Sequence, residues 1–193
     1  MRTSTLTRTT KETDVSLTLT LNAAQEGIID TGIAFLDHML TLLAFHGRMN
    51  LDIKATGDYD VDSHHVIEDV AIVLGEALKE ALGDKRGIER YASLHAPMDE
   101  SLSRIALDIS GRSMFVFEYT PVRETIGGFA LENVREFFQA FSNNAGLTLH
   151  ISVLYGLNDH HKVESIFKGL GRALYVATSI NNDTLPSTKG VLQ

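Results

Sequence analysis

The chain has 193 residues, of which 44% are hydrophobic and 22% are charged, and it contains no cysteine. This composition fits one globular domain, or two closely packed halves, and excludes disordered and fibrous proteins. A formal net charge of −8 argues against a broad surface for nucleic acid or anionic lipid, so any bound phosphate must meet a local cluster of cations. Without cysteine, histidine and carboxylate side chains are the metal ligands that remain.

No apolar run approaches the roughly 20 residues that a membrane span needs. The first residues lead directly into an alternating pattern and lack the apolar stretch of a signal peptide. We therefore expect a cytoplasmic protein with neither a membrane nor a nucleic acid as its partner.

Secondary-structure signals follow one another regularly in the first half. Residues 15–21 alternate apolar and polar side chains, which predicts a strand with one buried face. Residues 31–47 carry apolar side chains at helical spacing and end at a glycine, so a helix is expected there. After a short predicted strand at 50–55, a polar connector leads to Ser63, the expected N-cap of a helix over residues 64–82.

The second half repeats this scheme after a turn at residues 83–87, with no sign of a flexible linker. Its predicted elements are strands at 91–97, 102–110 and 114–119, a helix at 131–146, a strand at 147–155 and a helix at 160–178. We predict an α+β fold made by tandem duplication, in which each half buries a sheet under its helices. Residues 1–88 form the first half and residues 89–193 the second, within one compact unit.

Two short stretches of the chain are near copies of each other. His64 and His65 are followed by Glu68, and His160 and His161 are followed by Glu164 at the same spacing, 96 residues further on (64 to 160). Seven of the fifteen aligned positions are identical, where average residue usage predicts roughly one. A single doublet is usually a capping or solvent-exposed pair, but a duplicated doublet with its glutamate favours a metal site.

Helical geometry limits how these residues can bind an ion. Glu68 lies about 40° from His64 and about 60° from His65 around the helix axis, so the carboxylate and either imidazole can meet. The two adjacent histidines diverge by about 100°, which suits two separate ions, or one ion and a substrate. The remaining ligands must come from elsewhere, most simply from the equivalent helix at His160, in this chain or in a neighbouring subunit. Manganese, zinc, iron and nickel all fit this ligand set.

Other polar residues have ordinary explanations when each is considered alone. His38, on an apolar helix, reads as a core histidine bonded to Asp37 or to the backbone. Arg90 and Arg112 read as solvated surface charges. The stretch at 186–190 offers hydroxyl and ammonium donors to an anion, but its composition suits a mobile tail equally well.

Taken together, six motifs resemble the imidazoleglycerol-phosphate dehydratase family, and the resemblance spans essentially the whole chain. The motifs are residues 35–40, 62–69, 97–100, 108–112, 160–168 and 186–190. The resemblance implies two pseudo-symmetric halves of the ribosomal protein S5 domain 2-like type, with a helical layer between two mixed β-sheets. It also implies two manganese ions per active site and a homo-oligomer of 24 subunits built from trimers, with active sites between subunits.

The same resemblance assigns roles to individual residues. The implied manganese ligands are His38, His64, His65, Glu68, His160, His161 and Glu164. Glu136 stands where many members carry a histidine, and because a carboxylate can replace an imidazole on manganese, we expect Glu136 to ligate as well. Glu12 is the implied acid/base carboxylate. The residues implied to bind the substrate phosphate are Arg90, Arg112, Lys168, Ser187 and Lys189.

The implied reaction is the loss of water from D-erythro-imidazole glycerol phosphate, which gives imidazole acetol phosphate in histidine biosynthesis. The proton to be removed lies on a carbon without an adjacent carbonyl, so we expect a metal-bound imidazolate to expel the hydroxyl through a diazafulvene-like intermediate. Two alternatives stay open. One is a dinuclear-metal hydrolase of phosphate esters, and the other is a structural assembly that metal merely holds together.

Overall fold

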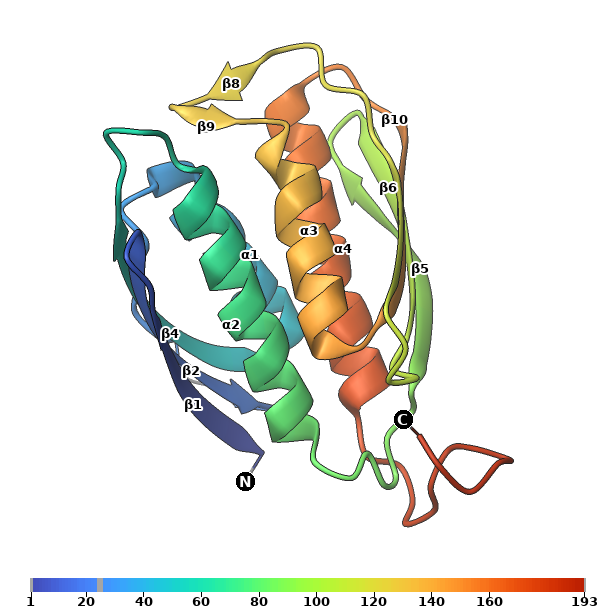
Figure 1. Cartoon of the computed structure of the whole chain (residues 1–193). Coiled ribbons are helices and arrows are strands. Elements are labelled where there is room, and N and C mark those ends of the chain that lie inside the picture. Colours follow the sequence, from blue (N-terminus) through green and yellow to red (C-terminus); the bar gives the residue numbers. More distant parts are fainter. Residues whose placement is uncertain (1, 24–25, 193) are drawn as a thin grey trace.

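The computed structural model describes residues 2–23 and 26–192, which form two sheets with helices between them (Figure 1). The first half contains β1 (Thr3–Thr9), β2 (Thr13–Leu21), β3 (Ile29–Asp30), α1 (Ala34–Gly47), β4 (Met49–Gly57) and α2 (His64–Leu82). The second half contains β5 (Tyr91–Met98), β6 (Ser101–Asp108), β7 (Met114–Glu118), β8 (Thr125–Ile126), β9 (Phe129–Ala130), α3 (Asn133–Ala145), β10 (Thr148–Tyr155) and α4 (Asp159–Thr178). Within this described part, no helix combines the length and apolarity that crossing a bilayer requires.

The two halves have the same topology. The strand order is β1-β2-β4-β3 in one sheet and β5-β6-β10-β7 in the other. In each sheet the first three strands are antiparallel, and the last strand pairs in parallel with its neighbour. The small β8–β9 hairpin is an addition to the second half. The predicted α+β fold, with duplicated halves and helices between two mixed sheets, is therefore confirmed.

Local details at the helix starts differ from the sequence-based predictions. Helix α1 begins at Ala34 and not at Thr31, because the Asp37 carboxylate accepts hydrogen bonds from the backbone and hydroxyl of Thr31 and holds that residue in a turn. Ser63 occupies the predicted N-cap position of α2, but its side chain makes no capping hydrogen bond. The Asp62 side chain accepts the His64 backbone N–H at 2.7 Å and so satisfies the first N–H group of the helix.

The hydrophobic core lies between the helices and the inner faces of the sheets. Along β2 the alternating residues Val15, Leu17 and Leu19 are at most 1% exposed, which is the pattern of a strand with one buried face. In the second half Phe137, Phe138 and Phe167 pack ring against ring inside the same core. The strand β1, which the sequence-based assignment left out, extends the first sheet through a complete antiparallel register with β2.

Two equivalent glycines bring the halves together. Helix α2 packs on α3, and α1 packs on α4, with the members of each pair running in the same direction (Figure 1). A Cβ atom on Gly75 would lie 2.7 Å from the Phe141 carbonyl oxygen, and one on Gly171 would lie 2.5 Å from that of Leu43. These glycines are 96 residues apart and occupy matching places in the repeat. Their missing side chains allow close helix packing across the boundary between the halves.

We predict that Gly171→Ala destabilises the protein by about 1–3 kcal/mol, because the added methyl group overpacks the α1–α4 contact by more than the helix propensity of alanine restores. Thermal unfolding of the purified variant measures the effect. Arg172→Ala, on the exposed side of the same helix, is the matched control and should leave stability within about 0.5 kcal/mol. A Gly171→Ala protein as stable as the wild type would show that this contact can relax.

Candidate active site

Both histidine doublets lie in the first turns of helices that begin at the same end of the molecule (Figure 1). The rings of His64 and His65 are 5.9 Å apart with planes at 80°, and those of His160 and His161 are 6.3 Å apart at 82°. The rings thus diverge, as helical spacing predicts. Each doublet presents two separate nitrogen donors and not a chelating pair.

His38 of α1 joins the doublet of α4. One ligand atom each from His38, His160 and Glu164 lies within 4.8 Å of the others. The Glu164 carboxylate is 3.2 Å from His160 Nε2 and 3.9 Å from His38 Nε2. His38 is 47% exposed at its side chain, so it is no core histidine. Two imidazoles and a buried carboxylate with converging lone pairs suit a divalent cation such as manganese or zinc.

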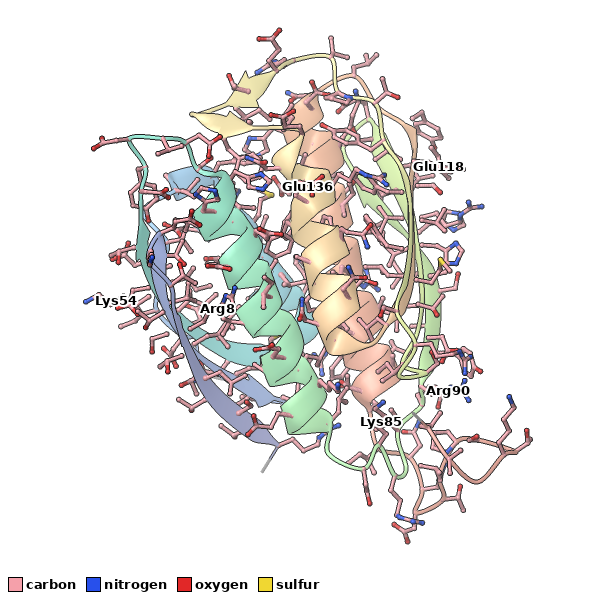
Figure 2. All side chains as sticks on the ribbon, in the orientation of Figure 1. Arg8, Lys54, Lys85, Arg90, Glu118 and Glu136 are labelled. Carbon is pink, nitrogen blue, oxygen red and sulfur yellow. The ribbon has the colours of Figure 1, made fainter. Side chains whose placement is uncertain are left out.

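The corresponding group on α2 is more open. His64 Nε2 lies 4.0 Å from the Glu68 carboxylate, and its Nδ1 lies 3.1 Å from the side-chain oxygen of Asn133, the first residue of α3. Glu136 is half-buried one turn further along α3, on the part of that helix nearest the doublets (Figure 2). Among the described residues, the compact group of three candidate ligands combines residues of α1 and α4, and not residues of α2 and α4.

The second histidine of each doublet is held by a carboxylate. His65 Nδ1 lies 3.0 and 3.2 Å from the two oxygens of Asp58, and His161 Nδ1 lies 2.7 Å from Glu100. These hydrogen bonds raise the pKa of both histidines. Backbone N–H groups of Asn158 and Leu157 also donate to Glu100 and, together with His161, lower the pKa of its carboxyl group.

Sequence reasoning did not assign these two carboxylates. Glu100 closes the motif at 97–100, and Asp58 lies in the polar connector before α2, so their positions were visible but their partners were not. Asp99, next to Glu100, is 3.8 Å from His161 Nε2 and is too distant for a hydrogen bond.

Glu12 lies in the turn between β1 and β2, beside the first doublet. Its carboxylate is 3.8 Å from His65 Nδ1 and 56% exposed. Asp69 of α2 fixes this turn, because it accepts hydrogen bonds from Arg8 at 2.7 Å and from the Thr13 hydroxyl. The buried Asp69 thereby ties the strand hairpin that carries Glu12 to the helix that carries the first doublet.

The residues implied to bind phosphate divide between the two ends of the helices. Lys168 forms an ion pair with Glu164 and so adjoins the ligand group. Arg90 lies at the opposite end (Figure 2), where its guanidinium grips Asp108 with two hydrogen bonds and donates a third to the Pro186 carbonyl. Its backbone N–H donates to the carbonyl oxygen of Ala177, near the end of α4. A helical rise of 1.5 Å per residue places Ala177 about 25 Å from His160.

The other three residues of this set lie on the surface or near it. Arg112 is exposed after β6, and its backbone N–H donates to Ser110. Lys189 is exposed in the C-terminal segment, and its backbone N–H donates to the Ser187 hydroxyl at 3.2 Å. Because Arg90 holds Pro186, it also anchors the start of the segment that carries Ser187 and Lys189.

Asp159 fastens the start of α4. Its carboxylate is 1% exposed and accepts hydrogen bonds from the backbone of Val122 and Arg123 and from the Lys162 ammonium group at 2.9 Å. Burial alone would raise the pKa of Asp159, but the hydrogen bonds from Lys162 and the two backbone N–H groups keep it below its ordinary value. The loop before β8 is thereby held against the helix turn that carries His160.

The fold and this site define a duplicated α+β enzyme with candidate metal ligands gathered where its helices begin. Residues 31–174 match the family model described as imidazoleglycerol-phosphate dehydratase. The chain is 56% identical to the imidazoleglycerol-phosphate dehydratases of Oceanobacillus iheyensis and Listeria welshimeri, over the full length of each protein.

Two solved structures are similar in fold and in sequence. The imidazoleglycerol-phosphate dehydratase of Staphylococcus aureus has 40% identity and a TM-score of 0.85, covering 93% of this chain and 99% of its own. That of Pyrococcus furiosus, in complex with (S)-C348, has 39% identity and a TM-score of 0.84, covering 97% and 100%. The chain belongs to the imidazoleglycerol-phosphate dehydratase family and is a hydro-lyase.

We predict that Asp159→Asn lowers stability at pH 7 by about 3 kcal/mol, because it leaves the buried Lys162 ammonium group without its charge partner. A carboxylate with a lowered pKa stabilises the fold above its unfolded pKa of about 4, and this contribution is lost as the pH falls through the folded value. The gap between wild type and variant should therefore shrink below about pH 4. Thermal unfolding at several pH values tests this, with the exposed Asp84→Asn as control. Equal unfolding temperatures at pH 7 would contradict it.

Proposed function

We propose that this chain is a manganese-dependent enzyme of histidine biosynthesis that acts in the cytoplasm. It removes water from D-erythro-imidazole glycerol phosphate and forms imidazole acetol phosphate. The observation that carries this proposal is the convergence of His38, His160 and Glu164 from two helices. These side chains suit a divalent cation, which could in turn bind a substrate that contains an imidazole ring. The names of the full-length relatives support the same reaction.

The donor set fits manganese through imidazole nitrogens and carboxylate oxygens. The residues proposed to hold two ions are His38, His64, His65, Glu68, Glu136, His160, His161 and Glu164. Two similar helix pairs, each with a histidine and a glutamate near its start, support the number of two. When bound, manganese would act as a Lewis acid on a substrate ring nitrogen and favour the deprotonated ring.

Glu12 is proposed to move protons at the substrate side chain. Its exposed carboxylate lies beside the first doublet, where it can donate a proton to the departing hydroxyl group. The Glu12 carboxylate that this leaves can accept the proton that the neighbouring carbon then loses, and the resulting enol tautomerises to the ketone. A well-placed acid/base group of this kind contributes roughly 10²–10⁴-fold to the rate.

The substrate phosphate is proposed to bind Arg90, Arg112, Lys168, Ser187 and Lys189, in active sites shared between subunits of a 24-subunit assembly built from trimers. Arg90 adjoins Ala177, about 25 Å along α4 from His160, and this supports shared sites, because one small substrate cannot reach both ends of the helix in a single chain. Exposed apolar side chains support self-association: Phe45 is 66% exposed and Ile180 is 56% exposed along one groove beside α1 and α4.

We predict that purified protein forms the ketone product only with manganese, and that complete chelation abolishes activity until manganese is returned. Ketone formation and phosphate release are measured side by side. Phosphate release without ketone would favour a phosphoester hydrolase instead. Full activity after complete chelation would overturn the proposal, and loss of assembly without any effect of substrate on the manganese EPR spectrum would favour a purely structural metal.

Another prediction concerns Glu12. Glu12→Gln should lower kcat by roughly 10²–10⁴-fold, because the amide cannot exchange the proton, while manganese binding and assembly stay unchanged. Steady-state kinetics, manganese titration and light scattering measure the three properties. Lys11→Gln, in the same exposed turn, is the matched control and should keep its activity. A kcat near that of the wild type in Glu12→Gln would remove Glu12 from the mechanism.

A further inference from the structure

The two halves use equivalent hairpins in different ways. The β1–β2 turn carries Glu12, and the β5–β6 turn carries Glu100; each turn brings its glutamate to the second histidine of the doublet in its own half. The outcome differs, since Glu100 lies 2.7 Å from His161 Nδ1 while Glu12 lies 3.8 Å from His65 Nδ1. Only the second-half glutamate forms a hydrogen bond with its histidine.

Asp58, and not Glu12, is the hydrogen-bond partner of His65. Both of its carboxylate oxygens lie within 3.2 Å of His65 Nδ1, and its backbone N–H donates to the Glu12 carbonyl at 3.1 Å. The connector that follows β4 thus supplies the partner of His65. The Glu12 carboxylate stays mostly exposed beside the doublet.

We propose that Asp58 and Glu100 are positioning residues that keep the proton of His65 and His161 on Nδ1 and leave Nε2 for a divalent cation. Asp58 thereby also frees Glu12 for proton transfer. This inference rests on the proposed function. A carboxylate only accepts hydrogen bonds, so the imidazole nitrogen facing it must carry the hydrogen, and the other nitrogen keeps its lone pair.

The surroundings of the two carboxylates make the inference testable by amide substitution. Glu100 Oε1 accepts backbone N–H groups of Leu157 and Asn158, while Oε2 faces His161. In Glu100→Gln the amide oxygen must stay on the backbone, so its NH₂ group faces Nδ1 and donates. His161 then holds its proton on Nε2, which is the wrong tautomer for a metal ligand.

Asp58 differs because both of its oxygens face the same histidine. In Asp58→Asn the side chain can turn its remaining oxygen toward His65 Nδ1 and preserve the tautomer. The two substitutions each remove one negative charge, yet only Glu100→Gln should move the histidine proton from Nδ1 to Nε2. A purely electrostatic or structural role would affect both variants alike.

The experiment titrates metal-free protein with manganese and follows binding by EPR and calorimetry. Glu100→Gln should bind manganese 10–100-fold more weakly at one of its sites, whereas Asp58→Asn should stay within a few-fold of the wild type. Asp60→Asn, an exposed residue of the same connector as Asp58, is the control for lost charge. The thermal unfolding of metal-free Glu100→Gln should match the wild type, since its backbone contacts remain.

Asp58→Ala gives a second, independent measurement. Without Asp58, Glu12 is the nearest carboxylate to His65 Nδ1 and should move onto it. Manganese binding is then largely kept, but kcat falls toward that of Glu12→Gln, while Asp58→Asn retains far more activity. If Glu100→Gln fails to fold, this comparison decides alone.

Two kinds of failure are distinguishable. A wild-type protein that neither binds manganese nor forms the ketone would end the proposed function itself. A wild-type protein that does both, together with normal manganese affinity in Glu100→Gln or equal losses in Glu100→Gln and Asp58→Asn, would overturn only the positioning roles.

Discussion

The site depends on four helices that start at one end of the molecule. Helices α1 and α4 run in the same direction, as do α2 and α3, so their first turns meet: His38 faces Glu164, and His64 faces Asn133. The amino end of each helix carries a partial positive charge, which favours nearby carboxylates. Glu68, Glu100 and Glu164 gather there. Their negative charge in turn makes the same end suitable for a cation.

Neither half contains the whole ligand group. His38 belongs to the first half, and His160 and Glu164 to the second, so the distance across α1 and α4 sets the distance between ligand atoms. That helix distance depends on Gly171, whose missing side chain lets α4 approach Leu43 and Gly47 closely. The packing between the duplicated halves therefore also sets the geometry of the site. A small shift of the helices would separate the donors before it exposed the core.

The repeating patterns made much of this fold predictable. Alternation in residues 15–21 and the two His-His-x-x-Glu stretches indicated strands, helices and a duplication, because such periodic signals are local. The partners of the ligands were not predictable in this way. His38 is a single polar residue on an apolar helix, and only the pairing of α1 with α4 gives it a role. Asp58 lies in a connector without any period, and its contact with His65 exists only after β4 and α2 are in place.

The same limit explains why the structure differs from the sequence-based predictions at the helix starts. Asp62 and Ser63 are adjacent and both are good capping residues, so composition alone does not decide which side chain bonds a free N–H group of the first turn. In the structure the Asp62 side chain bonds the His64 N–H, and the Ser63 side chain makes no capping bond. Similarly, Thr31 continues the helical spacing but is held outside the helix by Asp37. At Thr31 a local side-chain bond therefore replaces the helical backbone pattern.

Arg90 lies far from the ligand group of its own chain. Its guanidinium is already matched by Asp108 and is only 12% exposed, so it acts first as an organiser of the chain segment at Pro186. A substrate whose imidazole and phosphate are joined by three carbons is far shorter than the distance of about 25 Å along α4 from His160 to Ala177, which Arg90 adjoins. In the proposed reaction, an Arg90 that holds the phosphate must therefore meet the ligand group of another chain. The C-terminal segment that it anchors would then close a site whose metal ligands the neighbour supplies.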